Sequence, residues 1–365
     1  MKWSTRIGEF AGIPVYVHAT FLLLIAWVVL IHWGAGHSFP LVLQGVLFIL
    51  LLFVCVLFHE FGHALTAKKY GIRTRDITLL PIGGLSRLER MPDDPRQELW
   101  VALAGPAVNV VIAAVLFAWL TLTGGMEPFS GLTITSGSLL QRLLLVNVIL
   151  VVFNILPAFP MDGGRVLRAL LAMRMEYTRA TQIASSIGQA MAFFFGFIGL
   201  FTNPFLVFIA LFVWIGAAQE ASMVQMKSAL SGIPVQRAML TRFKTLSPQD
   251  TLASAVDLIL SGSQQDFPVV ENSRVVGILT RSDLVAGLAK QGQQSAVELV
   301  MRREFQTADS SEMLEPVFNR LQSCKCHTIP VEHGGKLVGL VTMENVGEFV
   351  AIQGALQKGK AALPA

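Results

Sequence analysis

Six apolar segments, each close to the length that crosses a lipid bilayer, dominate the chain before residue 220. Stretches this long and this poor in charge predict membrane-spanning helices, because a helix satisfies every backbone polar group internally. Hydrophobic residues make up 53% of the whole chain and charged residues only 14%, which is typical of a membrane protein. The predicted spans lie near residues 17–33, 41–67, 99–122, 139–158, 182–201 and 205–219.

The distribution of charge divides the chain into two parts. Residues 1–227 hold 15 Lys or Arg and 11 Asp or Glu, whereas the shorter stretch 228–365 holds 13 of each. We therefore expect a polytopic α-helical membrane domain at 1–220, a linker at 221–233, and a soluble C-terminal domain. The formal net charge of +4 falls wholly on the membrane part. Basic residues there set topology, so we expect the lipid bilayer, and no nucleic acid, as a partner.

The placement of Lys and Arg also predicts the orientation of the spans. The connecting segments near 34–40, 123–138 and 202–204 contain no Lys or Arg, whereas the opposite loops carry nearly all of them. Because basic loops stay in the cytoplasm, both termini and the soluble domain are expected to be cytoplasmic. The expected location is the plasma membrane, as a multi-pass protein.

The second predicted span ends in the sequence His59-Glu60-Phe61-Gly62-His63. Residues four apart share one face of a helix, so both imidazoles can bind one Zn²⁺, with Glu60 beside them as a base. Unpaired ionisable residues inside an apolar span cost on the order of several kcal/mol, so residues of this kind usually have a function. The alternative is a helix end whose histidines lie among lipid headgroups.

A catalytic zinc needs a third protein ligand and one open position. Asp162 is the best candidate, because it follows a segment with Pro157 and Pro160 that cannot continue the fourth span as a helix. Irregular backbone at membrane depth survives only inside protein or beside a wet cavity. The alternative is that Asp162 merely caps the helix that begins near Gly163.

These two motifs together resemble the site-2 protease family of intramembrane zinc metalloproteases. The resemblance covers residues 1 to about 220. It implies that His59, His63 and Asp162 bind zinc, that Glu60 is the general base, and that Asn154 contacts the substrate backbone or the developing oxyanion.

Two further stretches fit the same family. The sequence Ala-Gly-Pro-Ala-Val-Asn at 104–109 resembles a family motif, and it also fits close packing of small residues between helices. Residues 72–90 alternate loosely around Pro81 and Gly83, which predicts strand and turn. In the family this region is a sheet beside the active site, where a substrate can add as an extended strand. An ordinary interfacial loop is the alternative.

The soluble part repeats itself with a constant offset along the chain. Three stretches recur in this way: 238–240 with 300–302, 267–270 with 329–332, and 276–283 with 338–345. A constant offset indicates two copies of one supersecondary unit, with the order helix, strand, strand, helix, which we place at 234–290 and 296–350. We expect the last residues, 351–365, to form a flexible tail.

These copies resemble a tandem pair of CBS domains, which commonly bind adenine nucleotides such as ATP or AMP between the copies. The resemblance implies that Asp283 binds the ribose and that Thr280 faces the phosphates, with Thr342 in the matching position of the second copy. Asn345 replaces the acid there, which argues against a nucleotide at that position. The alternative is a pair that serves only to join two chains into a homodimer.

The sequence therefore predicts an intramembrane zinc protease. The family resemblance implies single-span membrane proteins as its substrates, and the CBS resemblance implies modulation by nucleotide. A CBS-gated transporter or channel, with the histidines in an ion path, is the alternative function. That alternative needs inverted repeats or a polar pathway through several spans. The sequence shows neither.

Overall fold

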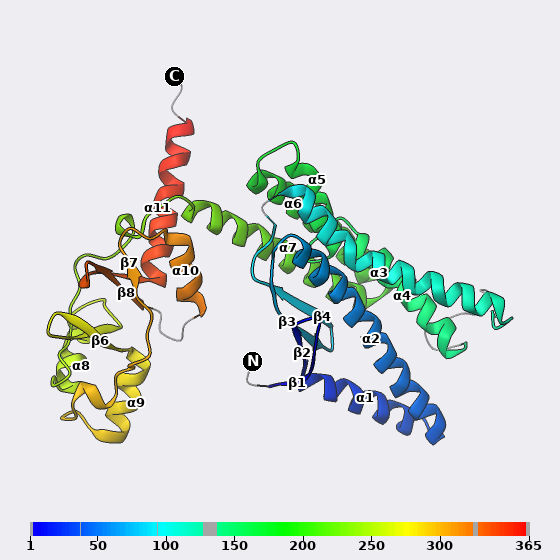
Figure 1. Ribbon diagram of the computed structural model, residues 1–365, viewed down its shortest axis with the longest axis horizontal. Helices are drawn as coiled ribbons and strands as arrows, with labels where there is room; N and C mark the ends of the chain where they lie inside the picture. The colour runs from blue at the N-terminus through cyan, green and yellow to red at the C-terminus, as the bar shows by residue number, and fades with distance from the viewer. Residues whose placement is uncertain (1–2, 37, 93, 127–136, 324–327, 363–365) are drawn as a thin grey trace. The chain divides into compact units, whose positions relative to one another are not determined.

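The structure is a computed structural model that describes residues 3–36, 38–92, 94–126, 137–323 and 328–362 (Figure 1). The chain forms two compact units, Met1–Ser222 and Met223–Ala365, each of which has its own internal packing.

The predicted spans correspond to helices in the first part of the chain. Four of these helices, α2, α3, α6 and α7, are long and apolar enough to cross a membrane. The expected spans near 17–33 and 139–158 are shorter helices of 15 and 17 residues, α1 and α4. The helix bounds are α1 Thr20–Gly34, α2 Phe39–Lys69, α3 Pro95–Leu122, α4 Leu139–Ile155, α5 Asp162–Ala172, α6 Tyr177–Thr202 and α7 Pro204–Leu230.

Large apolar side chains on the outside of these helices show which surface meets lipid. On α6 and α7 the outward residues include Phe193, Phe201, Phe205 and Phe208, each at least 68% exposed. An apolar surface of this size is unfavourable in water, so it fits a bilayer.

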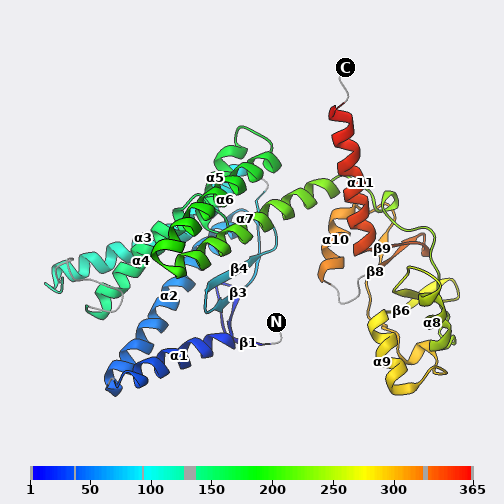
Figure 2. The same cartoon turned by 180° about the vertical axis from the view of Figure 1, so that it is seen from behind.

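Helix α3 is the centre of the first unit. It packs against α2, α4 and α5, and the run of α3 beside α4 is visible from both sides (Figures 1 and 2). The close approach of α2 to α3 depends on Gly62, because a Cβ there would lie 2.6 Å from the Ala104 carbonyl oxygen. The small residues of the 104–109 motif therefore do pack between helices.

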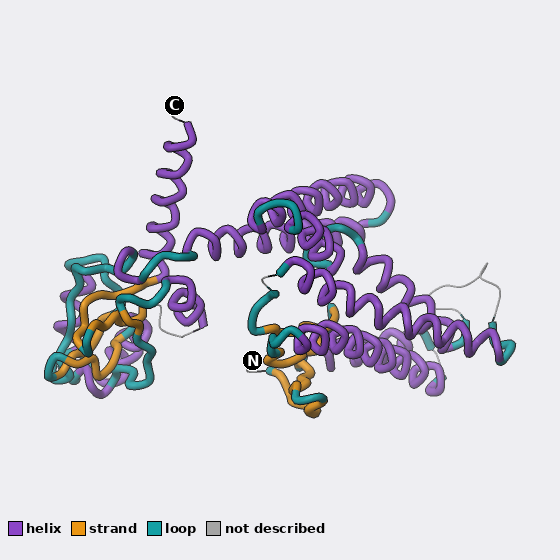
Figure 3. Tube along the Cα trace, turned by 45° about the horizontal axis from the view of Figure 1, so that its top comes forward, coloured by secondary structure: helices purple, strands orange, loops and turns teal. Residues whose placement is uncertain are grey.

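A four-stranded sheet in the order β1-β2-β3-β4 belongs to the same unit (Figure 3). Strands β3 Thr74–Leu80 and β4 Gly83–Leu88 form an antiparallel pair within the 72–90 region where strands are expected. The β1–β2 hairpin, Ser4–Phe10 and Ile13–His18, is not predicted by the span pattern. Its signal is the Ala11-Gly12 turn with positive φ at both residues, followed by alternating apolar residues. Strand β2 pairs in parallel with β3.

A buried ion cluster fixes α5 against its neighbours. Arg168 of α5 has no exposed surface and donates hydrogen bonds to Glu98 of α3 and to Glu220 of α7. Its guanidinium also lies 5.0 Å from the ring centroids of Phe159 and Tyr177. These contacts join α3, α5, α6 and α7 at one point.

The second unit repeats its elements at the expected constant offset. In the first copy α8 Leu252–Leu260 precedes β5 Phe267–Glu271, β6 Arg274–Leu279 and α9 Arg281–Gln291. In the second copy α10 Leu314–Ser323 precedes β8 Thr328–His333, β9 Lys336–Thr342 and α11 Met343–Ala362, with the short β7 Ala308–Asp309 paired to β8. Two short 3₁₀ helices, Val235–Arg237 and Val297–Leu299, are related by the same offset.

The segments expected to be a linker and a flexible tail are largely helical. Helix α7 continues to Leu230, whose side chain is fully buried in an apolar cluster of the second unit with Val235 and Phe318. Only a short turn at 231–233 follows, with positive φ at Gly232. Helix α11 extends through the region 351–362.

Arg168→Met tests the buried cluster. Removing the cation leaves Glu98, which is 1% exposed, as a buried charge without its partner. We expect the free energy of unfolding to fall by about 3–5 kcal/mol. Arg174→Met, at an exposed arginine just after α5, is the matched control and is expected to change it by less than about 0.5 kcal/mol. Thermal unfolding in detergent measures both, and equal midpoints for the two variants contradict a stabilising cluster.

Candidate metal centre

Helix α2 brings two histidine rings to one place. His59 and His63 are one turn apart and buried, and their Nε2 atoms are 3.1 Å from each other. The rings stand nearly perpendicular, with centroids 4.8 Å apart. The i, i+4 spacing therefore places both ring nitrogens on one face of the helix, inside the protein.

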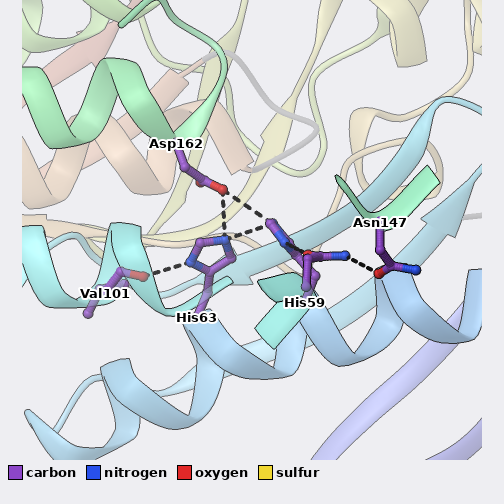
Figure 4. A network of polar contacts seen from close by, with 6 residues as sticks. His59, His63, Val101, Asn147 and Asp162 are labelled. Atoms are coloured by element: carbon purple, nitrogen blue, oxygen red, sulfur yellow. Dashed lines mark hydrogen bonds and ion pairs between the residues drawn. The ribbon is translucent and has the colours of Figure 1, made fainter. Parts of the chain in front are cut away.

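Asp162 joins this pair from the first residue of α5 (Figure 4). Its Oδ2 lies 3.2 Å from the Nε2 of His59 and 3.2 Å from the Nε2 of His63. Met161, not Asp162, is the N-cap residue of α5, and its side chain makes no capping hydrogen bond. Asp162 therefore points toward the histidines rather than serving as a helix cap.

The backbone around Asp162 is tightly packed. A Cβ on Gly163 would collide with the carbonyl oxygens of Ile155 and Leu156 at the end of α4. A Cβ on Gly164 would lie 2.6 Å from the backbone nitrogen of Phe159. The two glycines thus let the first turn of α5 fold back against the preceding segment, which places Asp162 at the depth of the histidines.

The hydrogen bonds at the Nδ1 atoms of the two histidines indicate which ring nitrogens carry a proton. The Nδ1 of His63 donates to the Val101 carbonyl oxygen at 2.7 Å, and the Nδ1 of His59 lies 2.5 Å from the Asn109 Oδ1. In neutral rings with Nδ1 protonated, both Nε2 atoms are acceptors, like the Asp162 oxygen. Three lone-pair atoms all within 4.8 Å of one another repel unless a cation lies between them.

A zinc ion fits this donor set. Two imidazole nitrogens and one carboxylate oxygen make the set of a catalytic zinc, which leaves one position open. Gly105 of α3 provides the space, since a Cβ there would lie 2.7 Å from the His59 Nε2 and closer still to the His63 ring. The family motif at 104–109 therefore does more than pack two helices, because its glycine makes room for the imidazoles.

Glu60 lies next to the cluster and against the sheet. Its side chain is half-buried, and a Cβ on Gly84 of β4 would lie 2.5 Å from its Cγ and 2.9 Å from its Oε1. Gly84 therefore leaves the space that the Glu60 carboxylate occupies. The acid of the HExxH motif and an edge strand of the sheet are in direct contact.

Asn154 is not part of the hydrogen-bond network drawn in Figure 4. It is the second-last residue of α4 and is half-buried. The asparagine of α4 that does join the network is Asn147, whose Oδ1 accepts from the Asn109 Nδ2 at 2.8 Å. Sequence reasoning missed Asn147, although a polar residue inside an apolar span is itself a signal of function.

In the second unit, Thr280 and Thr342 line a cavity, whereas Asp283, which was expected to bind the ribose, does not. Asp283 receives hydrogen bonds from Arg302 at 2.5 and 3.0 Å and from the Thr280 hydroxyl at 2.5 Å. Burial raises the pKa of Asp283, but the hydrogen bonds from Arg302 and Thr280 outweigh it and hold the pKa below its usual range. The carboxylate expected to bind a ribose is thus already occupied.

A cavity of about 850 Å³ is lined by residues of both copies. Thr280, Thr342 and Asn345 line it, whereas Asp283 does not. The repeat explains the difference, because the residue that corresponds to Arg302 is Leu240, which cannot bridge to Asn345 as Arg302 bridges to Asp283. The backbone of Leu240 still pairs with Leu340, as Arg302 pairs with Ile278. The cavity therefore lies beside Asn345, the position at which the sequence argued against a nucleotide.

Gly105→Ala tests the metal centre. The added methyl group overlaps the ring nitrogens of His59 and His63, so we expect zinc in the purified protein to fall well below about one ion per chain. Gly34→Ala, at a helical glycine whose added Cβ would meet no described atom within 4 Å, is the matched control and should keep its zinc. Elemental analysis measures the metal, and full zinc in the Gly105 variant would contradict the assignment.

Comparisons with known proteins identify the family of the chain. Peptidase family M50 matches residues 47–195, and the CBS domain matches residues 230–290 and 296–351. A zinc metalloprotease of Methanocaldococcus jannaschii is 32% identical over 353 residues, which cover 96% of this chain and 97% of that protein. Stage IV sporulation protein FB of Bacillus subtilis is 26% identical, covering 56% of this chain and 62% of its own length.

Among solved structures, the site-2 protease from Methanocaldococcus jannaschii is 37% identical. It covers 60% of this chain and 95% of its own, with a TM-score of 0.45. The sequence identity to the first relative extends over nearly all of both chains. This chain therefore belongs to the site-2 protease group of peptidase family M50, and it is a membrane-embedded zinc metalloprotease with a C-terminal pair of CBS domains.

Proposed function

We propose that this protease hydrolyses a peptide bond in or near the transmembrane segment of single-span membrane proteins. The observation that carries the proposal is the position of the metal centre. His59, His63 and Asp162 are buried, and the histidines lie on α2, a helix long and apolar enough to cross a membrane. A substrate that reaches these residues must come from within or beside the bilayer.

The residues of the cluster are proposed to have the following roles. His59, His63 and Asp162 hold the zinc, which when bound polarises a carbonyl and lowers the pKa of a bound water toward ~7. Glu60 accepts the proton of the attacking water and delivers it to the leaving amine. Asn154 is proposed to hydrogen-bond the substrate backbone, because it lies on the last turn of α4, shortly before Asp162.

The sheet provides the binding surface for an unwound substrate. A helical substrate hides its carbonyls in its own hydrogen bonds, so it must become extended before cleavage. Strand β4 is an edge strand of the sheet, and its Gly84 contacts Glu60. An extended segment that pairs with β4 thus lies alongside the base. The β4 edge supports endoproteolysis of a strand-like segment.

The active site is proposed to open toward the cytoplasm, with both termini on that side. Lys68 and Lys69 end α2 between one and two turns beyond His63, and Arg165 follows Asp162 on α5. Basic residues close to the ends of spans favour the cytoplasmic face. The transporter or channel alternative is not favoured, because membership of the protease family accounts for the buried histidines.

Glu60→Gln separates catalysis from metal binding. The amide cannot accept the proton, so cleavage should fall by at least about 100-fold while zinc stays bound. Asp162→Ala is the contrasting variant, expected to lose most of the zinc as well. Proteomics on membranes with Glu60→Gln should show uncleaved single-span proteins that co-purify with the enzyme. Cleavage by Glu60→Gln at the wild-type rate, with zinc bound, would refute the role of Glu60 as the base.

We further propose that the CBS pair binds an adenine nucleotide and thereby modulates proteolysis. The support is the cavity of about 850 Å³, large enough for a nucleotide, with Arg242 and Arg281 among its lining residues for phosphate groups. Thr280, Thr342 and Asn345 line the same cavity and supply polar groups for a ribose. Asp283 is not assigned this role, because Arg302 already binds it. A homodimer formed through the CBS pair remains part of the proposal.

Leu240→Arg and Asp283→Asn together test which position binds nucleotide. An arginine at 240 stands where Arg302 stands in the other copy, so it should fill the cavity beside Asn345 and abolish binding. Asp283→Asn leaves the cavity unchanged and should keep binding. The measurement is the shift of the unfolding midpoint of the full-length protein with ATP and with AMP. Binding lost in Asp283→Asn but kept in Leu240→Arg would place the nucleotide at the first copy.

A further inference from the structure

A chain of hydrogen bonds runs from the metal centre across three helices. His59 of α2 contacts Asn109 of α3, which donates to Asn147 of α4, which in turn donates to the Leu143 carbonyl oxygen of its own helix. The three distances are 2.5, 2.8 and 2.8 Å. Asn109 and Asn147 have no exposed surface. Buried amides in apolar helices are costly unless every group is used.

The donors and acceptors in this chain of hydrogen bonds can be assigned, starting from Asn147. Its amide nitrogen donates to the Leu143 carbonyl, so its Oδ1 faces Asn109. That oxygen accepts only from a donor, so the nitrogen of Asn109 faces Asn147 and its Oδ1 faces His59. The Asn109 oxygen in turn requires a proton on the Nδ1 of His59. The lone pair of that ring is therefore on Nε2, beside Asp162.

We propose that Asn147 is a positioning residue that acts through Asn109 to fix the tautomer and orientation of His59. The inference rests on the proposed role of His59 as a zinc ligand. Asn147 is the residue that decides the chain's direction, because Asn109 by itself can turn its amide either way at similar cost. His63 needs no such partner, since its Nδ1–H donates to the Val101 carbonyl oxygen, which can only accept.

The proposal predicts different effects for two substitutions of nearly equal size. In Asn147→Leu the acceptor for Asn109 disappears, so Asn109 can turn and present its nitrogen to His59. The His59 proton then moves to Nε2 and occupies the position of the lone pair. Asn147→Asp keeps an acceptor oxygen toward Asn109, and the direction of the chain is preserved. Loss of the bond to the Leu143 carbonyl is common to both variants.

Zinc affinity and the absorption spectrum of the Co²⁺-substituted protein measure the state of His59 without relying on activity. We expect the zinc affinity of full-length Asn147→Leu in detergent to fall about 10–100-fold, the range usual for residues behind a metal ligand. Its Co²⁺ spectrum should lose intensity in the d–d bands. Asn147→Asp should stay within a few-fold of wild type, with the wild-type spectrum. Val148→Ala, on the exposed side of α4, controls for changes to the helix itself.

The same substitution made in an Asn109→Asp protein keeps the test decisive if Asn147→Leu alone is unstable. In Asn109→Asp both oxygens accept, so the His59 proton is held whichever way the carboxylate turns. Asn147→Leu should then have little further effect on zinc affinity. An equal loss from Asn147→Leu in both backgrounds, or an equal loss from Asn147→Leu and Asn147→Asp, overturns the proposal and leaves a packing role.

His59→Ala distinguishes this failure from failure of the ligand assignment. Unchanged zinc affinity in His59→Ala removes the proposed ligand set itself. Loss of zinc in His59→Ala with unchanged affinity in Asn147→Leu removes only the positioning role.

Discussion

Three acceptor atoms that meet in a buried site are the constraint on which the membrane unit depends. The Nε2 atoms of His59 and His63 and the Oδ2 of Asp162 lie 3.1–3.2 Å from one another. In an apolar surrounding, such a meeting of lone pairs is unfavourable without a cation. Neighbouring features follow from it: Gly105 leaves space for the rings, and the bond from His63 to the Val101 carbonyl sets one tautomer.

The position of Asp162 in the cluster depends on the position of α5, which is a short helix and not one of the membrane-length helices. The segment before it is irregular, and α5 itself has only 11 residues. Arg168 holds α5 in place through ion pairs with Glu98 of α3 and Glu220 of α7. Since Glu220 lies on α7, the last helix before the CBS repeats, the position of α5 is tied to that helix.

The two copies of the CBS repeat differ in the side chains at one pair of corresponding positions, Arg302 and Leu240. Both copies keep the same backbone pairing, yet Arg302 closes the position at Asp283, whereas Leu240 leaves the position at Asn345 open. The Arg302 guanidinium binds the Asp283 carboxylate through two charge-assisted hydrogen bonds, which are stronger than neutral ones. The acid that the sequence predicts as a ligand contact, Asp283, is thus bound by Arg302 in the structure.

The sequence by itself determined the class of the protein and pointed to the three side chains that meet in the buried cluster. Long apolar runs specify helices, and the spacing of His59 and His63 specifies a shared face, because both depend on neighbours along the chain. The two copies of the CBS repeat are likewise local and were predicted with their offset. The irregular segment before Asp162 pointed to the third ligand, since prolines and glycines break a helix wherever it lies.

Tertiary structure alone decided the contacts between distant segments. That Asn147 rather than Asn154 joins the network behind His59 depends on how α3 and α4 pack, which no spacing within α4 reveals. The position of the β1–β2 hairpin is set by the pairing of β2 with β3, a contact between residues far apart in the chain. Arg302 and Asp283 meet for the same reason, across the fold of the repeat. The chain's residues supply the polar groups, and three-dimensional packing decides which partners satisfy them, because a buried donor or acceptor must be paired wherever the fold places it.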